Sequence, residues 1–153
     1  MKNFLLTLLL AALASSVLCA RSLSEIKSSG VIRVGVYDAQ PPFGKLEDGV
    51  HRGFEVDMAN EIAKDIFKNG GKVEFISTAA NQRIRYLQED KVDMVIATIT
   101  VTPEREKQID FTTPYFSVNI GVLTRVEDKI RSLGDLKDQT ILVLNGGTSE
   151  PYF

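Results

Sequence analysis

The chain has 153 residues, and its 18 basic and 20 acidic side chains give a formal net charge of −2 at pH 7. Hydrophobic residues make up 44% of the sequence, which is the composition of a globular protein with enough apolar residues for one core. Without a basic surplus the chain is not a typical nucleic-acid-binding protein. A single histidine and a single cysteine give no metal-ligand spacing, and we expect no cofactor.

Residues 1–20 have the pattern of a secretory signal peptide. Lys2 supplies a positive start, and residues 4–13 form an apolar run that is too short to span a membrane. Cys19 leaves two outcomes open. A small residue normally precedes a lipidated cysteine, and Leu18 stands there instead. We therefore expect a free exported protein, with a lipid anchor on Cys19 as the alternative.

Strand and helix patterns alternate after this segment. Apolar side chains recur every four positions at Phe54, Met58, Ile62 and Ile66, which predicts an amphipathic helix over residues 54–67. In chain order the expected elements are a helix at 22–29, a strand at 31–37, the helix at 54–67, a strand at 73–76, a helix at 83–89 and a strand at 92–99. This order indicates an α/β fold with parallel strands and right-handed crossovers.

Open α/β sheets bind ligands at the carboxyl ends of their strands. Tyr37 ends the first expected strand, and Thr98 and Thr100 lie at or just past the end of the last one. These three side chains are therefore expected along one rim of the sheet, where a single site could use them.

A further helix is expected to begin at Thr102, which has N-cap chemistry, with Pro103 at the first helical position. Arg105 does not suit this helix start, because a cation in the first turn costs about 0.3–1 kcal/mol. A bound anion would resolve the conflict, since arginine binds carboxylates through two hydrogen bonds. We predict that Arg105, the helix N-terminus and the two threonine hydroxyls hold a small carboxylate ligand. The alternative is a solvated ion pair with Glu106 or Asp110.

Several stretches between residues 24 and 153 resemble, in one order, the motifs of the family 3 periplasmic solute-binding proteins, which deliver polar amino acids to ABC importers. The sequence resembles both cysteine-binding and aspartate/glutamate-binding members, so the resemblance does not identify the ligand. The stretches are 30–36 (GVIRVGV), 41–44 (PPFG), 53–57 (GFEVD), 92–97 (VDMVIA), 97–105 (ATITVTPER), 110–115 (DFTTPY) and 146–149 (GGTS).

The resemblance implies the type II periplasmic-binding-protein fold, in which two α/β lobes with parallel-rich sheets enclose the ligand. Residues 21–124 would form lobe 1, and residues 125–153 the hinge and the start of lobe 2. Since the sequence stops at Phe153, just into lobe 2, we expect an N-terminal fragment with a truncated second lobe. Expected beyond residue 115 are a β-rich run at 118–124, a short helix or turn at 132–137, a strand at 140–144 and a helix opening at 146–149.

The resemblance also implies a ligand-binding role for several residues. It assigns the ligand's α-carboxylate to Arg105, assisted by the hydroxyl and backbone N–H of Thr100. It places the backbone carbonyl of Ala97 and the side chain of Thr98 against the ligand's ammonium group. In the family an acidic residue of lobe 2 also pairs with that ammonium, at a position beyond residue 153.

Tyr37 and Phe43 resemble the family's aromatic wall, although a core role stays open for Phe43. Arg83 matches an arginine that reaches the ligand side chain in aspartate and glutamate receptors and is also present in cysteine receptors. Thr148 and Ser149 match the lobe 2 loop whose N–H groups complete the carboxylate cage, at an expected helix N-terminus.

Three other polar residues receive no site role. Glu55 and Asp57 are interpreted as charges that suit the start of a helix. His51 lies in a polar turn over residues 47–52 and is expected to be exposed.

We therefore expect a monomeric periplasmic receptor that closes on an amino acid about a hinge near residues 124–128 and docks on a membrane permease of an ABC transporter. No bond is made or broken in this function. Two alternatives from other classes are a dehydratase-like enzyme of the same fold and the ligand-sensing domain of a membrane receptor.

Overall fold

The computed structural model describes residues 20–68 and 70–152. Most of the expected signal peptide, Cys19 included, lies outside the described residues. Within them, every helix is too short or too polar to cross a membrane.

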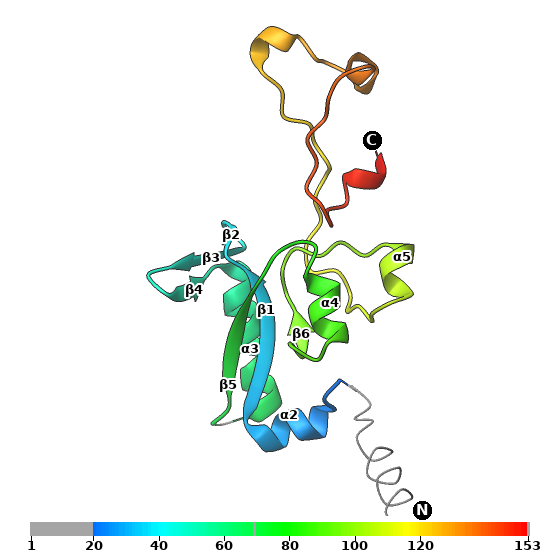
Figure 1. The fold of residues 1–153 in the computed structure, drawn as a ribbon. Coiled ribbons are helices and arrows are strands. Elements are labelled where there is room, and N and C mark those ends of the chain that lie inside the picture. Colours follow the sequence, from blue (N-terminus) through cyan, green and yellow to red (C-terminus); the bar gives the residue numbers. More distant parts are fainter. Residues whose placement is uncertain (1–19, 69, 153) are drawn as a thin grey trace, which may run out of the picture.

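A three-stranded parallel sheet forms the centre of the lower part of the chain in Figure 1. Strand β1 (Val31–Tyr37) lies between β5 (Lys72–Thr78) and β6 (Met94–Val95). Its pairing with β5 runs in register, so the carboxyl ends of the two strands meet at one edge. The predicted α/β class with parallel pairing is therefore confirmed.

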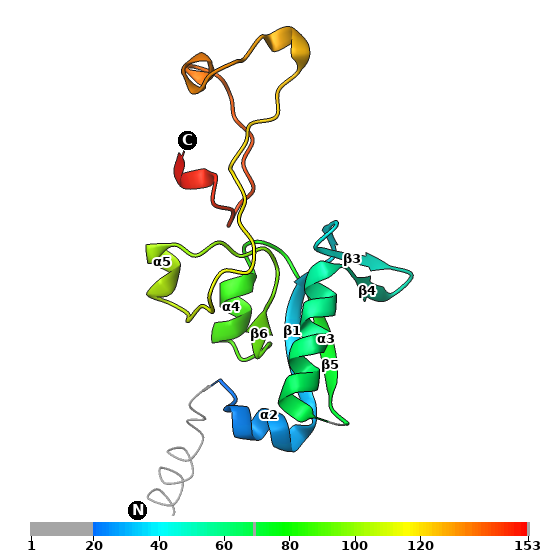
Figure 2. The same ribbon diagram turned by 180° about the vertical axis from the view of Figure 1, so that it is seen from behind.

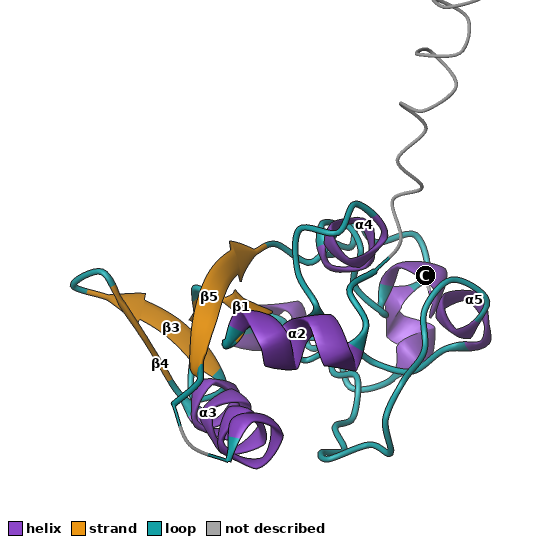
Figure 3. Cartoon of the chain, turned by 90° about the horizontal axis from the view of Figure 1, so that it is seen from below, coloured by secondary structure: helices purple, strands orange, loops and turns teal. Residues whose placement is uncertain are grey.

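The described residues form four α-helices, of which the first three contact this sheet: α2 (Leu23–Ser29), α3 (Phe54–Phe67), α4 (Arg83–Gln88) and α5 (Pro103–Glu106). Figures 2 and 3 show α3 along β1 and β5, whereas α4 and α5 lie toward the β6 side. The buried core residues come mainly from β1 and α3, and they are Ile26, Ile32, Val34, Val36, Val56, Ala59, Ala63 and Ile96. The helix predicted at 54–67 has those bounds, but its first residue, Phe54, is 45% exposed instead of packed in the core.

The strand predicted over residues 92–99 is wrong in length, because only Met94–Val95 pair as a strand. At the start of this stretch the side chain of Asp93 accepts a hydrogen bond from the backbone N–H of Arg33. This bond takes the place of a backbone hydrogen bond between the two strands. At its end Thr98 has a φ of +44°, so the backbone turns out of the sheet. The residues that follow Thr98 therefore lie outside the sheet, where they can line a pocket.

A second, antiparallel sheet was not predicted. It consists of β2 (Ala39–Gln40), β3 (Gly44–Glu47) and β4 (Val50–Arg52). His51 lies on β4, and its Nε2 is 3.0 Å from Asp38 Oδ1 and 3.2 Å from Ser77 Oγ. The prediction that His51 is an exposed residue in a turn is therefore wrong, since its side chain is only 11% exposed.

Residues 116–145 extend away from this body as two segments that run side by side (Figures 1 and 2). The strands expected at 118–124 and 140–144 do not form within the described chain. Leu123 is 100% and Leu142 98% exposed, so no packing favours strand structure here. Two short 3₁₀ turns, η1 (Val126–Asp128) and η2 (Leu133–Leu136), lie within this part of the described chain, and a third, η3 (Glu150–Tyr152), follows it.

Candidate functional site

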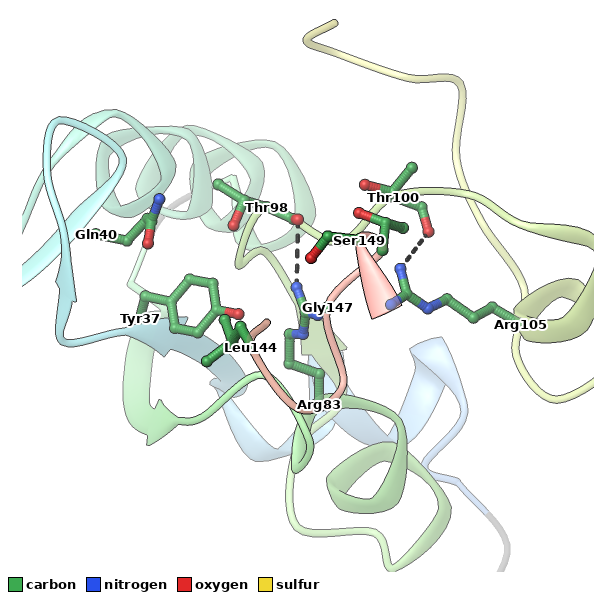
Figure 4. A pocket seen from close by; sticks show the side chains of 10 residues that line it. Tyr37, Gln40, Arg83, Thr98, Thr100, Arg105, Leu144, Gly147 and Ser149 are labelled. Atoms are coloured by element: carbon green, nitrogen blue, oxygen red, sulfur yellow. Dashed lines mark hydrogen bonds between the residues drawn. The ribbon is translucent and has the colours of Figure 1, made fainter. Parts of the chain in front are cut away.

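A small polar pocket of about 200 Å³ lies just past the carboxyl ends of β1 and β6 (Figure 4). Residues from β1, the stretch after β6, helices α4 and α5 and the returning segment 144–149 converge on it. Its lining residues are Tyr37, Gln40, Arg83, Thr98, Thr100, Arg105, Leu144, Gly147, Thr148 and Ser149. This volume is below the range of about 300–1,000 Å³ that is common for ligand pockets, so it suits only a small molecule.

The pocket brings together seven of the nine predicted site residues, and two lie elsewhere. Ala97 is 0% exposed beneath the pocket, where its carbonyl accepts a hydrogen bond from Arg83. Phe43 packs in an aromatic cluster, with ring centroids 6.3 Å from Phe54 and 5.1 Å from Phe116. Phe43, which was expected in the aromatic wall of the site, is therefore not part of the pocket lining. Gln40, Leu144 and Gly147 line it without having been predicted.

Helix α5 positions Arg105 at the pocket. Its N-cap is Thr102, as predicted, and the hydroxyl of Thr102 accepts the backbone N–H of Arg105 at 3.3 Å. Because α5 has only four residues, the expected contribution of a helix dipole to anion binding is not supported. The predicted charge chemistry of this site therefore depends on the guanidinium group itself.

The Arg105 guanidinium uses two of its five N–H donors within the described chain. Nη1 donates to the carbonyl of Thr100 at 2.8 Å and Nη2 to that of Gly146 at 2.9 Å, which leaves three donors available. No ion pair between Arg105 and a carboxylate forms among the residues that the structure describes, so the alternative pairing with Glu106 or Asp110 is wrong.

Arg83, at the start of α4, is 3% exposed and uses four of its five donors. Its Nε donates to the carbonyl of Ala80 at 3.0 Å, and Nη1 donates to those of Ala97 and Thr98 at 2.8 and 3.2 Å. Nη2 donates to the carbonyl of Gly146 at 3.0 Å. Arg83 thus lines the pocket with one N–H left over, whereas Arg105 retains enough donors for a two-point contact with a carboxylate.

Glu55 is a buried acid, although the sequence indicates only a charge at a helix start. It does lie in the first turn of α3, but it is 0% exposed and its Oε1 accepts the N–H of Thr98 at 2.6 Å and the hydroxyl of Tyr115. Burial and this carboxylate raise the pKa of Tyr115. From the first turn of α3, the buried carboxylate of Glu55 therefore reaches the backbone of a pocket residue.

Gly53 explains how α3 begins so close to its neighbours. Its φ is +131°, and a Cβ at this position would lie 2.3 Å from the carbonyl oxygen of Phe43. No side chain caps the helix, whose next two N–H groups, of Phe54 and Glu55, bond to the carbonyls of Pro42 and Phe43. Glycine is required here, and it brings Glu55 under the pocket.

The segment 146–149 closes one side of the pocket through its backbone. Gly146 has a φ of +78°, and a Cβ there would lie 2.7 Å from the Cα of Asn81. The helix expected after Ser149 is the three-residue turn η3, so an anion site at a helix N-terminus is not supported. Close backbone contact and the two arginine hydrogen bonds hold this segment instead.

The electrostatics of the pocket are those of an anion site. Two guanidinium groups line it, and no aspartate or glutamate is among its lining residues. Burial lowers the pKa of both Arg83 and Arg105, and burial raises the pKa of Tyr37. No group of three or more potential metal ligands occurs within residues 20–68 and 70–152. A carboxylate is the ligand group that this charge distribution favours.

Comparisons with known proteins identify the family of this chain. The family model of bacterial extracellular solute-binding proteins, family 3, matches residues 32–146. A glutamine-binding protein of Geobacillus stearothermophilus is 36% identical over 136 residues, which are 84% of this chain and 50% of that protein. The chain spans about half the length of the curated relatives it matches.

Two solved structures are also similar. A solute receptor for L-cysteine of Neisseria gonorrhoeae is 41% identical with a TM-score of 0.81, over 87% of this chain and 55% of that one. A mutant of the arginine-bound form of domain 1 from TmArgBP is 35% identical with a TM-score of 0.57, over 62% of this chain and 72% of that one. The chain therefore belongs to the bacterial extracellular solute-binding proteins, family 3.

Proposed function

We propose that this chain forms the first lobe and part of the ligand site of a receptor that delivers a polar amino acid to an ABC importer. One observation carries the proposal: two guanidinium groups meet in a small pocket that no acidic side chain lines. Arg105 retains three N–H donors, which suits a two-point contact with an α-carboxylate.

The proposed roles follow from the pocket. Arg105 binds the α-carboxylate, and Thr100 and Ser149 contribute hydroxyls near it. Thr98 contacts the ammonium group, and Tyr37 packs against the apolar part of the amino acid. Thr148, next to Ser149, completes the side of the pocket that the second lobe supplies.

The remaining features of the proposal concern the whole protein. Residues 1–20 export it to the periplasm, residues 21–124 form lobe 1, and residues 125–153 begin the hinge and lobe 2. It is a monomer whose closed form docks on the importer's permease. The relatives compared above are named for binding glutamine, cysteine or arginine, which favours a binding protein over the dehydratase-like alternative.

Calorimetry of the full-length protein against the twenty L-amino acids and cystine tests the proposal. We expect at least one of them to bind, and Arg105→Ala to weaken that binding by about 2–5 kcal/mol, because a buried carboxylate loses its charge partner. Arg85→Ala is the matched control, since Arg85 lies on α4 with a 56% exposed side chain. The proposal is wrong if no amino acid binds, or if Arg105→Ala binds as tightly as the wild type.

A further inference from the structure

A buried carboxylate and a buried guanidinium face each other across one peptide unit. Oε1 of Glu55 accepts the N–H of Thr98 at 2.6 Å, and Nη1 of Arg83 donates to the carbonyl of Ala97 at 2.8 Å. That N–H and that carbonyl belong to the same peptide. The Ala97–Thr98 peptide therefore bridges the two charges, one from α3 and one from α4.

The bridge contributes to the compensation of both charges, beside the Tyr115 hydroxyl that bonds to Glu55 and the other carbonyls that bond to Arg83. Glu55 is 0% and Arg83 3% exposed, and neither forms a direct ion pair within the described residues. Oε2 of Glu55 is buried and has no hydrogen-bond partner there. An isolated buried charge is strongly destabilising, whereas a polarised peptide between opposite charges stabilises both.

The same bridge fixes an uncommon backbone conformation in the pocket wall. Thr98 has a φ of +44°, which is rare for a β-branched residue. Its N–H is bound by Glu55, and its carbonyl accepts a second bond from Arg83 at 3.2 Å. Such a conformation persists only where surrounding contacts determine it. Here these contacts come from the two buried charges.

We infer that Glu55 is a positioning residue of the ligand pocket: with Arg83 it clamps the Ala97–Thr98 peptide and so sets the direction of the Thr98 side chain. Its effect on affinity rests on the proposed function, whereas the coupling between Glu55 and Arg83 does not require a ligand. Two measurements on the full-length protein separate these claims.

The first measurement is calorimetry with the twenty L-amino acids and cystine, and the amino acid that binds the wild type most tightly is then titrated into the variants. Glu55→Met removes both acceptor oxygens, and we expect it to weaken binding at least about tenfold, the effect of losing a hydrogen bond to a charged group. Glu55→Gln keeps one acceptor and should restore the affinity to within about threefold of the wild type. Asp57→Met, at the exposed acid two residues further along α3, is the matched control and should bind as the wild type does.

The outcomes of this titration are distinct. Wild-type affinity in Glu55→Met overturns the positioning role. If the wild-type protein binds no amino acid at all, the proposed function fails, and the second measurement decides on the bridge.

The second measurement is a double-mutant cycle on the unfolding equilibrium with Glu55→Met, Arg83→Met and both together. We expect the double variant to be more stable than the two single effects predict, by at least about threefold in the folding constant. Arg85→Met, the exposed control on α4, should show no coupling with Glu55→Met. Additive effects at Glu55 and Arg83 would overturn the bridge.

An NMR comparison keeps the inference testable if a methionine variant does not fold. The Thr98 amide proton, bound to a carboxylate in the wild type, should resonate clearly downfield of its position in Glu55→Gln. An unchanged resonance would overturn the bridge.

Discussion

Arg83 and Arg105 donate to the same carbonyl oxygen, that of Gly146, at 3.0 and 2.9 Å. The arginines come from α4 and α5, and Gly146 belongs to the segment that returns from the extended part of the chain. Two like charges thus converge on one backbone dipole. Burial and the charge of Arg105 both lower the pKa of Arg83. A ligand carboxylate bound next to this carbonyl would relieve the repulsion between the arginines.

Gly146→Ala should detach the returning segment from the pocket. The new Cβ would lie 2.7 Å from the Cα of Asn81, at a φ of +78°. We expect a loss of about 1 kcal/mol or more in the free energy of unfolding, together with weaker amino-acid binding. Gly49→Ala is the matched control, since Gly49 has a φ of +76° and no atom within 4 Å of its Cβ position. Equal effects of the two substitutions in urea titrations and calorimetry would contradict the role of this contact.

Thr102→Ala should weaken binding although Thr102 is outside the pocket lining. The hydroxyl of Thr102 accepts the backbone N–H of Arg105, and α5 is a single turn, so loss of the cap frees the backbone that carries the guanidinium. The free energy of unfolding should fall by about 0.5–2 kcal/mol, measured by urea titration. Thr102→Ser keeps the hydroxyl, and in calorimetry it should bind like the wild type. A serine variant as impaired as the alanine variant would argue against the capping account.

Asp93 should make stability depend on pH. Its side chain is 1% exposed and accepts hydrogen bonds from the guanidinium groups of Arg21 and Arg33. Although burial raises it, these arginine hydrogen bonds bring the pKa of Asp93 far below its ordinary value of 3.8. The stabilisation is therefore complete above about pH 4 and is lost as the pH falls toward the depressed folded-state pKa.

Asp93→Asn should accordingly cost about 1–3 kcal/mol at pH 7, and the difference from the wild type should shrink steadily below pH 4. Urea titrations between pH 7 and pH 2 measure this difference. Asp90→Asn serves as the control, because Asp90 is 30% exposed and bonds through its carboxylate to Arg33 alone. A difference for Asp93→Asn that stays constant with pH would contradict the account.

Local patterns predicted the main elements of the fold. The strand at 31–37 and the helix at 54–67 have the expected bounds, since apolar periodicity and flanking glycines are local signals. The antiparallel sheet β2–β4 was missed because its strands are short and their residues are typical of loops and turns. The strand at 92–99 was predicted too long, because hydrogen bonds between side chains and backbone end the pairing on both sides: Asp93 bonds to the N–H of Arg33, and Glu55 bonds to the N–H of Thr98.

The pocket was predictable where polar residues stand at the ends of expected strands, as Tyr37 and Thr98 do, and where a cation stands in the first turn of a helix, as Arg105 does. The burial of a charged side chain was not predictable, because such burial depends on partners that are distant in the sequence. Glu55 bonds to a residue 43 positions away, and Asp93 to one 60 positions away. Glu55 follows Gly53 and an aromatic residue at the start of a helix, and this local pattern does not indicate a distant partner.

A crystal structure of the full-length protein with a bound amino acid tests the central claim most directly. The account predicts an α-carboxylate oxygen within about 3.2 Å of a guanidinium nitrogen of Arg105, with Thr98 and Thr100 alongside. A bound amino acid whose carboxylate lies away from Arg105, with that guanidinium still bonded only to the carbonyls of Thr100 and Gly146, would contradict it.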